Sequence, residues 1–404
     1  MFNTFNPLGN RPGDRFGDAA RLVPAGVAVP VAAATVARPV LDDRRVSPAR
    51  AMSGGEAKML SISLVMPNYN HAHFLERSLG ALFEQAVQPD EIIIVDDAST
   101  DGSIELIERL IEGRANVVLV RNEKRMGAVA ALNKGLLLAH GDVVGFPSAD
   151  DLVHPGYLQA LEHLLRVHPK AAFACACVEI RDEGDAVQGS RPIMWPTLTP
   201  RYVAPAEASR QLGRGDNYFL GSVTLYRRQA LEQVGGFDER LASLADGMLQ
   251  RRLAVQHGYC FQPQTLGVWR HHASNYSITS VTDPQRLDGL LAGAADWIGR
   301  DPGNDFPRGY ADLFARRLRF NAARVVLISA MPHEVKAARI AHMAGAGRRD
   351  AEMIAKLCAK GKLGAVLLLA WLALRLRPLS FARLGVEPFR RAASRGMVAL
   401  FRQA

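Results

Sequence analysis

The feature that most constrains the fold is a regular alternation, between residues 58 and 151, of short apolar runs with stretches of helical spacing. The apolar runs are residues 62–66, 91–95, 117–120 and 143–146. Short apolar runs bounded by turn residues are typical of buried strands, and strands that alternate with helices through short loops form a mostly parallel sheet. The sequence therefore predicts an α/β fold built on such a sheet.

Polar loops follow three of the predicted strands, at residues 67–70, 96–101 and 150–151. Because the carboxyl ends of parallel strands meet at one edge of a sheet, we expect these loops to line the crevice where open α/β sheets bind ligands. Asp150 and Asp151 are adjacent carboxylates that repel each other unless a positive charge lies nearby. A divalent cation such as Mg²⁺, shared with substrate phosphates, is one explanation, and capping of the following helix is the alternative.

The net charge is distributed unevenly along the chain. Of the formal +9, residues 351–404 contribute +8, with ten Lys or Arg against two Glu, and residues 1–57 contribute +2, with seven Arg against five acidic residues. The intervening body is therefore close to neutral, which argues against nucleic acid binding by the main domain. The basic C-terminus indicates contact with an anionic surface instead.

The most apolar segment of the chain is the run at residues 363–374, which Lys and Arg flank. As a helix it would be about 18 Å long, well short of the roughly 30 Å hydrocarbon core of a bilayer. Together with the amphipathic stretch at 389–401 it predicts a helix that lies in the membrane interface, and a core helix packed on the main domain is the alternative. Residues 1–57 are interrupted by many prolines and are expected to be a disordered extension.

The cysteines predict no disulfide framework. Cys175 and Cys177 alternate along one face of an apolar run, which fits two buried strand residues better than a zinc pair. A reducing cytoplasm is therefore the expected compartment.

The strand-end loops resemble the motifs of family 2 glycosyltransferases. The matching stretches are Val-Met-Pro-Asn-Tyr-Asn at 65–70, Ile-Val-Asp-Asp-Ala-Ser-Thr-Asp-Gly-Ser at 94–103, Ala-Asp-Asp at 149–151 and Val-Gly-Gly-Phe-Asp-Glu-Arg-Leu at 234–241, with Asn122, Gly127, Asn133 and Gly135 in the expected order. The resemblance covers about residues 60–280. It implies a GT-A fold and an inverting transfer of a sugar from a nucleotide diphosphate donor.

The resemblance also implies a donor site. Pro67, Tyr69 and Asp97 match positions around the nucleotide base, and Asn70 and Asn133 match the pattern as further nucleotide-sugar-binding residues. A carboxylate can accept the imide N–H of uracil or thymine, and a UDP-sugar is the expected donor; helix capping is the alternative role of Asp97.

For the metal site, the resemblance implies Mg²⁺ or Mn²⁺ with Asp151 as a ligand and Asp150 on the ribose or metal side. His272 matches a family histidine and is assigned to the metal, with a structural role as its alternative. Arg270 could bind diphosphate oxygens bidentately. Many relatives have a further Asp where this chain has Ser148, which leaves fewer charges for the cation.

The general base implied by the resemblance is Asp246, which would take the proton of the acceptor hydroxyl. Relatives usually have Glu where this chain has Ala245, and capping of the helix at 248–255 is the alternative role of Asp246. Residues 217–228 resemble the strand beneath the acceptor. A binding module that holds nucleotide sugar without turnover is the competing interpretation, because of Ser148 and Ala245.

The expected organisation is an extension at 1–57, a GT-A domain at 58–280 and a helical region with a basic tail at 281–404. Within the domain, residues 58–151 form the nucleotide-binding half and residues 152–280 the acceptor half. We expect a cytoplasmic enzyme, peripheral on the inner face of the plasma membrane, that glycosylates a glycan or glycolipid in surface polysaccharide assembly.

Overall fold

The computed structural model describes residues 58–192, 195–215, 220–272, 275–301, 303 and 305–378, which belong to one compact unit that begins at Lys58. Three predictions fall outside the described residues: the extension at 1–57, the amphipathic stretch at 389–401, and residues 217–219 of the segment expected beneath the acceptor.

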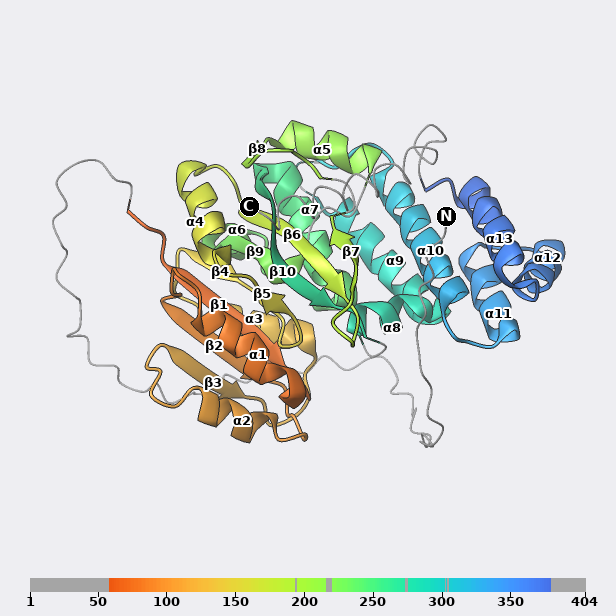
Figure 1. Ribbon diagram of the computed structural model, residues 1–404. Helices are drawn as coiled ribbons and strands as arrows, with labels where there is room; N and C mark the ends of the chain where they lie inside the picture. Colours follow the sequence, from red (N-terminus) through yellow and green to blue (C-terminus); the bar gives the residue numbers. More distant parts are fainter. Residues whose placement is uncertain are drawn as a thin grey trace, which may run out of the picture. The chain divides into compact units, whose positions relative to one another are not determined.

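Four parallel strands form the half of the sheet that the apolar runs predict (Figure 1). They are β1 (Ile62–Asn68), β2 (Glu91–Asp96), β3 (Val117–Arg121) and β4 (Val143–Gly145), in the spatial order β3-β2-β1-β4. Successive residues of β1 are buried on both faces of the sheet, and this is why the strand appears in the sequence as a continuous apolar run. The prediction of a mostly parallel α/β sheet is confirmed.

The sheet continues into a second half through an antiparallel strand. β9 (Thr224–Arg227) pairs antiparallel with β4 and with β6 (Phe173–Arg181), and β10 (Tyr259–Arg270) runs parallel to β6. Three short strands complete the edges: β5 (Leu152–Val153) and β8 (Arg201–Val203) pair with β10, and β7 (Val187–Arg191) pairs with β6.

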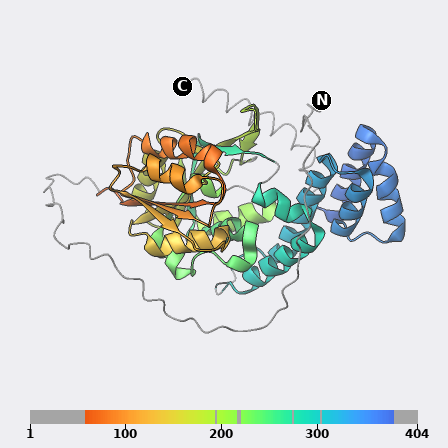
Figure 2. The ribbon, with the colours of Figure 1, turned by 90° about the horizontal axis from the view of Figure 1, so that it is seen from below.

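Helices cover both faces of the sheet. α1 (Ala72–Phe83), α2 (Ser103–Leu110) and α4 (Tyr157–Val167) share one hydrophobic core with Leu64 and Met66 of β1. α3 (Ala128–Leu138), α5 (Pro205–Arg214), α6 (Arg228–Gln233) and α7 (Ala245–His257) share the opposite core with Val65. Figure 2 shows α1 and α2 on one side of the sheet and α3 on the other. Alternate residues of β1 therefore face different helices, as the two-residue period of a strand requires.

The C-terminal part of the chain is helical, as predicted. It comprises α8 (Tyr276–Thr282), α9 (Pro284–Gly299), α10 (Tyr310–Ile328), α11 (His333–Met343), α12 (Arg348–Cys358) and α13 (Gly361–Leu376). Apolar side chains of α9 to α13 form a third hydrophobic core. The buried Arg317 of α10 joins this region to the acceptor half, because its guanidinium donates to the carbonyl oxygens of Leu212 at 2.7 Å and Gly213 at 3.2 Å, at the end of α5.

The predicted apolar helix at 363–374 is α13, and it has two different faces. Leu368 and Leu372 are fully buried in the third core. Leu363 and Leu367 are 67% and 48% exposed. None of the helices in the described ranges is long and apolar enough to cross a membrane. Part of the run is thus packed among the C-terminal helices, and part of it is open to solvent.

Candidate active site

The sheet brings the polar loops to one edge. Asn68 at the end of β1 is in register with Asp96 at the end of β2, and Asp96 is in register with Arg121 at the end of β3. The loops that follow these strands therefore start side by side. Side-chain bonds join them further, because the Asn68 amide donates to the Asp96 carboxylate at 2.7 Å and Ser99 Oγ donates to the same oxygen at 2.7 Å.

Asn70 and Tyr69 shape the loop after β1. Asn70 has a left-handed backbone (φ 56°), its backbone N–H donates to Ser99 Oγ at 3.0 Å, and its side-chain oxygen accepts from the Thr100 N–H at 2.8 Å. The Tyr69 ring lies 4.0 Å from the guanidinium carbon of Arg125. Asn70 therefore holds the loop in place, and Tyr69 presents a flat surface beside a positive charge.

Asp97 is 2% exposed and binds the loop that leads into α3. Its Oδ1 accepts from Asn122 Nδ2 at 2.9 Å and from the Met126 N–H at 2.7 Å, and its Oδ2 accepts from the Gly127 N–H at 2.7 Å. A carboxylate has about four lone-pair positions, so three are used and one on Oδ2 remains. Asp97 thus orders its surroundings and keeps one acceptor position.

Asp150 and His272 meet at the end of β10. The Asp150 Oδ2 atom lies 3.0 Å from His272 Nε2, and the Nδ2 amide of Asn275 lies 3.0 Å from the same nitrogen. The Phe74 ring packs at 5.7 Å from the imidazole. Burial raises the pKa of Asp150, but the hydrogen bond to His272 and the charge of His71 outweigh it, so that the pKa lies below its ordinary value.

Asp151 lies elsewhere, in the protein interior. It is 6% exposed, and its Oδ1 accepts from the backbone N–H of Arg270 at 3.0 Å. Burial, and next the charge of Asp150, raise its pKa well above the ordinary value. The sequence prediction assigned Asp151 to the metal with His272, and this assignment stays a prediction: the structure pairs His272 with Asp150, and the Asp151 carboxylate bonds to β10.

His71 was not singled out from the sequence, although it directly follows the motif at 65–70. Its Nδ1 atom is buried and has no hydrogen-bond partner among the described residues. Burial lowers its pKa, and the charge of Asp150 opposes this effect. An imidazole nitrogen left unpaired beside the Asp150 and His272 pair is a polar group that a ligand could satisfy.

Asp246 lies in the first turn of α7. Its Oδ1 accepts from the Gly247 N–H at 2.7 Å, a contact within the turn, while the N-cap position is Leu244 and no side chain among the residues that the structure describes caps the helix. Gly221 leaves room for the carboxylate, because a Cβ at that position would be 2.9 Å from Asp246 Oδ2. Burial raises the pKa of Asp246, and the Gly247 N–H and the charge of Arg251 offset only part of this effect. A carboxylate with a raised pKa is a stronger base once it has lost its proton.

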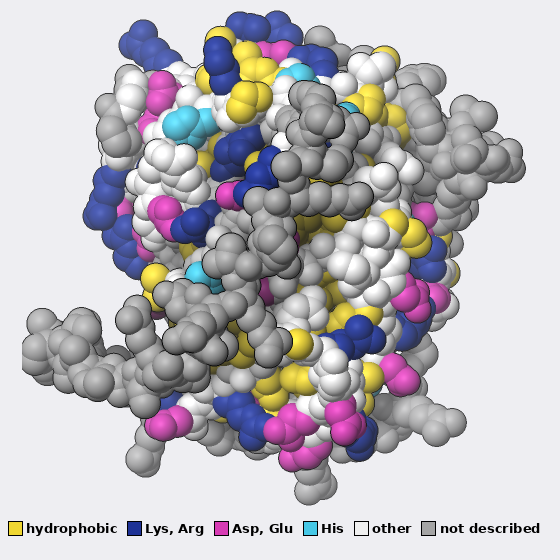
Figure 3. Space-filling view, turned by 90° about the vertical axis from the view of Figure 1, so that its left-hand side faces the viewer, with side chains coloured by type: hydrophobic (Ala, Val, Ile, Leu, Met, Phe, Trp, Pro, Cys, Tyr) yellow, Lys and Arg dark blue, Asp and Glu magenta, His cyan; other side chains and the backbone are white. Residues whose placement is uncertain are grey.

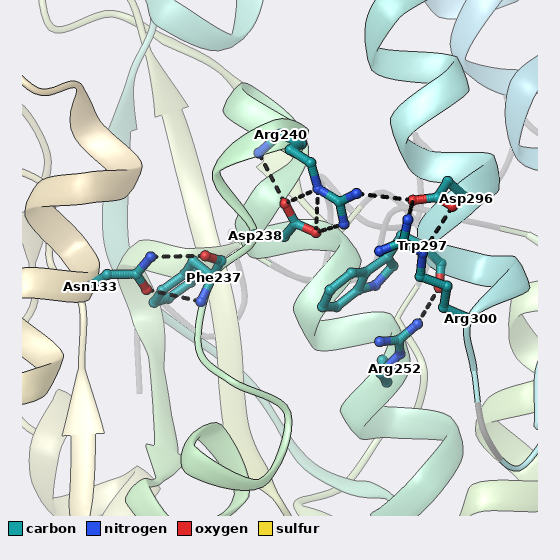
Figure 4. Close-up of polar contacts among 8 residues, drawn as sticks. All are labelled: Asn133, Phe237, Asp238, Arg240, Arg252, Asp296, Trp297 and Arg300. Carbon is teal, nitrogen blue, oxygen red and sulfur yellow. Dashed lines mark hydrogen bonds and ion pairs between the residues drawn. The ribbon is translucent and has the colours of Figure 1, made fainter. Parts of the chain in front are cut away.

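Asn133 holds the segment that precedes Asp246. Its Nδ2 donates to the Phe237 carbonyl oxygen at 2.8 Å, and its Oδ1 accepts from the Phe237 N–H at 3.0 Å (Figure 4). Both ends of the amide are thus engaged by the protein backbone. The sugar-binding role expected of Asn133 remains a prediction, and the contact that the structure shows is a structural one.

An ion-pair network fixes the same segment from the other side. Arg240 bonds Asp238 at 2.9 Å and Asp296 of α9 at 3.1 Å, and Asp296 also binds Arg300 (Figure 4). The Arg252 guanidinium lies 3.8 Å from the Trp297 ring centroid. The Arg240 contacts anchor the chain just before Asp246, and the Arg252 contact anchors α7 just after it; Asp296 and Trp297 are too far away in the sequence for motif reasoning to find.

The comparisons with known proteins agree with this architecture. Residues 63–235 match the model of the family "Glycosyl transferase family 2". An uncharacterized protein of Mycobacterium tuberculosis, MT1568, is 30% identical over 239 residues, 56% of this chain and 74% of its own length. An uncharacterized glycosyltransferase of Nostoc, alr2836, is 28% identical and covers 56% of this chain and 70% of its own length. The amylovoran biosynthesis glycosyltransferase AmsB of Erwinia amylovora is 36% identical over 104 residues, 25% of this chain and 35% of its own length.

Two solved structures share the fold. TarS 1–349 of S. aureus, in complex with UDP-GlcNAc, superposes with a TM-score of 0.54 at 15% identity, over 78% of this chain and 91% of that one. The mannosyltransferase PcManGT of Pyrobaculum calidifontis, in complex with GDP-Man and Mn²⁺, has a TM-score of 0.51 at 23% identity, over 80% and 86% of the two chains. The chain belongs to glycosyltransferase family 2 and is a glycosyltransferase with the GT-A fold.

Proposed function

We propose that the protein transfers a sugar, with inversion, from a nucleotide diphosphate donor to a hydroxyl group of a glycan or glycolipid. The observation that carries the proposal is the placement of the Asp150 and His272 pair on the same sheet edge as the Asp97 loop. Nucleotide sugars bound to structures of the same fold, UDP-GlcNAc on TarS and GDP-Man on PcManGT, support it.

In this proposal Asp97, Tyr69 and Pro67 bind the nucleotide base. The remaining acceptor position of Asp97 suits the imide N–H of uracil, and the Tyr69 ring offers a surface on which a base can stack. A UDP-sugar is therefore the expected donor. Asn70 acts by holding this loop, and Arg270 binds the diphosphate.

Asp150 and His272 are the residues that would hold Mg²⁺ or Mn²⁺. Adjacent ligands of an octahedral ion at about 2.1 Å are about 3.0 Å apart, which is the separation of Asp150 Oδ2 and His272 Nε2. The described residues contain no preformed group of three His, Cys, Asp or Glu ligands, so phosphate oxygens and water would complete the shell. The ion would neutralise the charge that develops on the leaving diphosphate.

Asp246 is the proposed base. Its carboxylate accepts the proton of the acceptor hydroxyl while that oxygen attacks the sugar from the face opposite the leaving group, which inverts the anomeric centre. A positioned base of this kind contributes about a hundred- to ten-thousand-fold in rate. The segment held by Asn133 and Arg240 fixes the start of its helix.

We also propose that the exposed face of α13 attaches the enzyme to the inner leaflet of the plasma membrane. Leu363 and Leu367 are exposed beside Lys360 and Lys362, and exposed apolar side chains flanked by basic residues bind anionic interfaces. On the face shown in Figure 3, acidic and basic side chains are interspersed, in keeping with a near-neutral body. Surface polysaccharide assembly is the proposed context, as the name of AmsB suggests for that relative.

The test is donor turnover by the purified full-length protein, with UDP- and GDP-sugars and with Mn²⁺, Mg²⁺ or a chelator. We expect release of the nucleoside diphosphate only when a divalent cation is present, and loss of release in Asp246→Asn when acceptor is supplied. Binding of nucleotide sugar without turnover under all these conditions would instead support the non-catalytic module.

A further inference from the structure

The hairpin between β6 and β7 has an ordered tip that places one carboxylate. Asp182 Oδ1 accepts from the Gly184 N–H at 3.0 Å and the Ala186 N–H at 2.9 Å, and the Asp185 N–H donates to the Asp182 carbonyl oxygen at 3.0 Å. Asp185 has a left-handed backbone (φ 66°), which glycine adopts more easily than any other residue. Asp is one of the few residues with a side chain that adopt it routinely, so the turn places a carboxylate at the tip of the hairpin.

Three arginines converge on that carboxylate from three different elements. Arg77 of α1 lies 3.3 Å from Asp185 Oδ2, Arg181 of β6 lies 3.7 Å from the same oxygen, and Arg270 of β10 lies 3.6 Å from Asp185 Oδ1. We refer to Arg77, Arg181 and Arg270 as the arginine cluster. Glu179 also binds Arg181, at 3.0 Å, so two carboxylates face three guanidinium groups. The cluster keeps an excess of positive charge.

The carboxylate of Asp185 fits this cluster poorly. The Arg270 Nη2 and Asp185 Oδ1 atoms are both buried, and neither has a hydrogen-bond partner in the described part of the chain, because 3.6 Å is too long for a hydrogen bond. A buried guanidinium nitrogen without a partner is unfavourable. A phosphate group has more oxygens and more charge than a carboxylate, and guanidinium groups bind it bidentately.

The arginine cluster adjoins the proposed metal site. The guanidinium carbon of Arg270 lies 5.5 Å from the Phe74 ring centroid, and the same ring lies 5.7 Å from the imidazole of His272. Phe74 therefore separates the cluster from the Asp150 and His272 pair by one aromatic ring. A phosphate bound by the arginines would lie close to the cation.

We propose that the arginine cluster is a phosphate-binding site and that Asp185 occupies it as an internal competitor until a substrate phosphate displaces the hairpin tip. The inference rests on the proposed function, in which Arg270 binds the diphosphate. It adds Arg77 and Arg181 to the phosphate-binding residues and Asp185 as a competing carboxylate. The phosphate belongs either to the donor diphosphate or to a phosphorylated acceptor. Displacement exchanges one carboxylate for a phosphate and also releases the left-handed strain at Asp185.

The experiment measures binding of inorganic pyrophosphate to the full-length protein by calorimetry. Asp185→Asn should bind about tenfold more tightly, the equivalent of roughly 1.4 kcal/mol, because the competing charge is gone. Glu183→Gln is the matched control, since it removes the same charge from an exposed position of the same tip and should leave the affinity unchanged. Arg77→Gln should weaken binding. Unchanged or weaker binding by Asp185→Asn, or an equal gain in Glu183→Gln, would overturn the proposal.

A second measurement needs no substitution. Amide hydrogen exchange of residues 182–188 should become faster when pyrophosphate is added to the wild-type protein, and slower exchange there would contradict displacement of the tip. A competition experiment identifies the source of the phosphate. If the site binds the donor diphosphate, UDP displaces pyrophosphate. If the site binds a phosphorylated acceptor, pyrophosphate still binds the UDP-saturated protein. Donor turnover is measured separately. If Asp185→Asn binds pyrophosphate more tightly but the protein shows no donor turnover, only the proposed function is refuted.

Discussion

The carboxylate of Asp150 and the imidazole of His272 lie 3.0 Å apart although 122 positions separate them in the sequence. The neighbouring Asp151 points into the interior, and the two carboxyl groups have pKa values shifted in opposite directions. Two adjacent residues thus make different contacts: Asp150 pairs with His272, and Asp151 fastens the loop to β10.

This division gives a first prediction about the metal. Asp150→Asn should lower the affinity for Mn²⁺ by at least about tenfold, as expected when one of only two protein ligands loses its charge. Asp151→Asn is the matched control, and it should retain most of the affinity because its carboxylate bonds to the Arg270 N–H and not to His272. Calorimetric titration of Mn²⁺ into each variant, with UDP present, distinguishes the two. A larger loss in Asp151→Asn would restore the assignment made from the sequence.

A second prediction concerns the base. Asp246→Asn should lower the transfer rate by about a hundredfold or more while the affinity for the donor changes little, since the base acts on the acceptor. Steady-state kinetics with both substrates, together with direct donor binding, would measure this. Loss of donor binding of the same size would assign Asp246 a structural role instead.

The raised pKa of Asp246 leads to a third prediction, on pH. Because burial raises the pKa of the folded state, the folded protein keeps a proton that the unfolded chain has already lost above about pH 3.9. The free energy of unfolding therefore falls as the pH rises toward the folded-state pKa, and stays lower above it. Asp246→Asn should remove this dependence and be more stable than the wild type at neutral pH.

Urea unfolding at several pH values, followed by circular dichroism, measures the effect. Asp142→Asn serves as the opposite case, because hydrogen bonds from Ser61 lower the pKa of Asp142. The Asp142 carboxylate therefore stabilises the folded state at neutral pH, and this stabilisation is lost as the pH falls. If both substitutions changed the pH dependence of the free energy of unfolding by the same amount and in the same direction, the explanation would be contradicted.

A fourth prediction concerns α13. The double variant Leu363→Gln, Leu367→Gln should lower co-sedimentation with anionic vesicles by about tenfold or more, because exposed Leu side chains lose their transfer energy into the interface. Leu137→Gln removes an 86% exposed leucine from α3 and should bind vesicles as the wild type does. High salt should weaken binding of the wild type without abolishing it. Equal binding to neutral and anionic vesicles would refute the electrostatic part.

Much of the fold could be predicted because its signals are local. The apolar runs mark the strands within two residues, and the motifs after them reach a common edge because parallel strands end there. The sequence could not show that Asp150 pairs with His272 while Asp151 bonds to β10, because these contacts depend on how the turn between β4 and β5 packs on the end of β10. Nor could it find the bond between Arg77 and Asp185, because the two are 108 positions apart and their contact depends on the packing of a hairpin tip on α1. The sequence could not show which side of α13 is buried, because apolar residues lie on all sides of this helix.

The buried members of the third core, formed by the C-terminal helices, are distinct from the buried members of the two cores that surround the sheet. Substitutions in well-separated sites have nearly additive effects on stability. Sequence drift in α11, α12 and α13 can therefore proceed without repacking the cores of the sheet, whereas α9 and α10 also contribute Trp297 and Tyr310 to one of those cores. In an evolving lineage, the exposed face of α13 can diversify while the strand-end loops of the sheet keep their sequence.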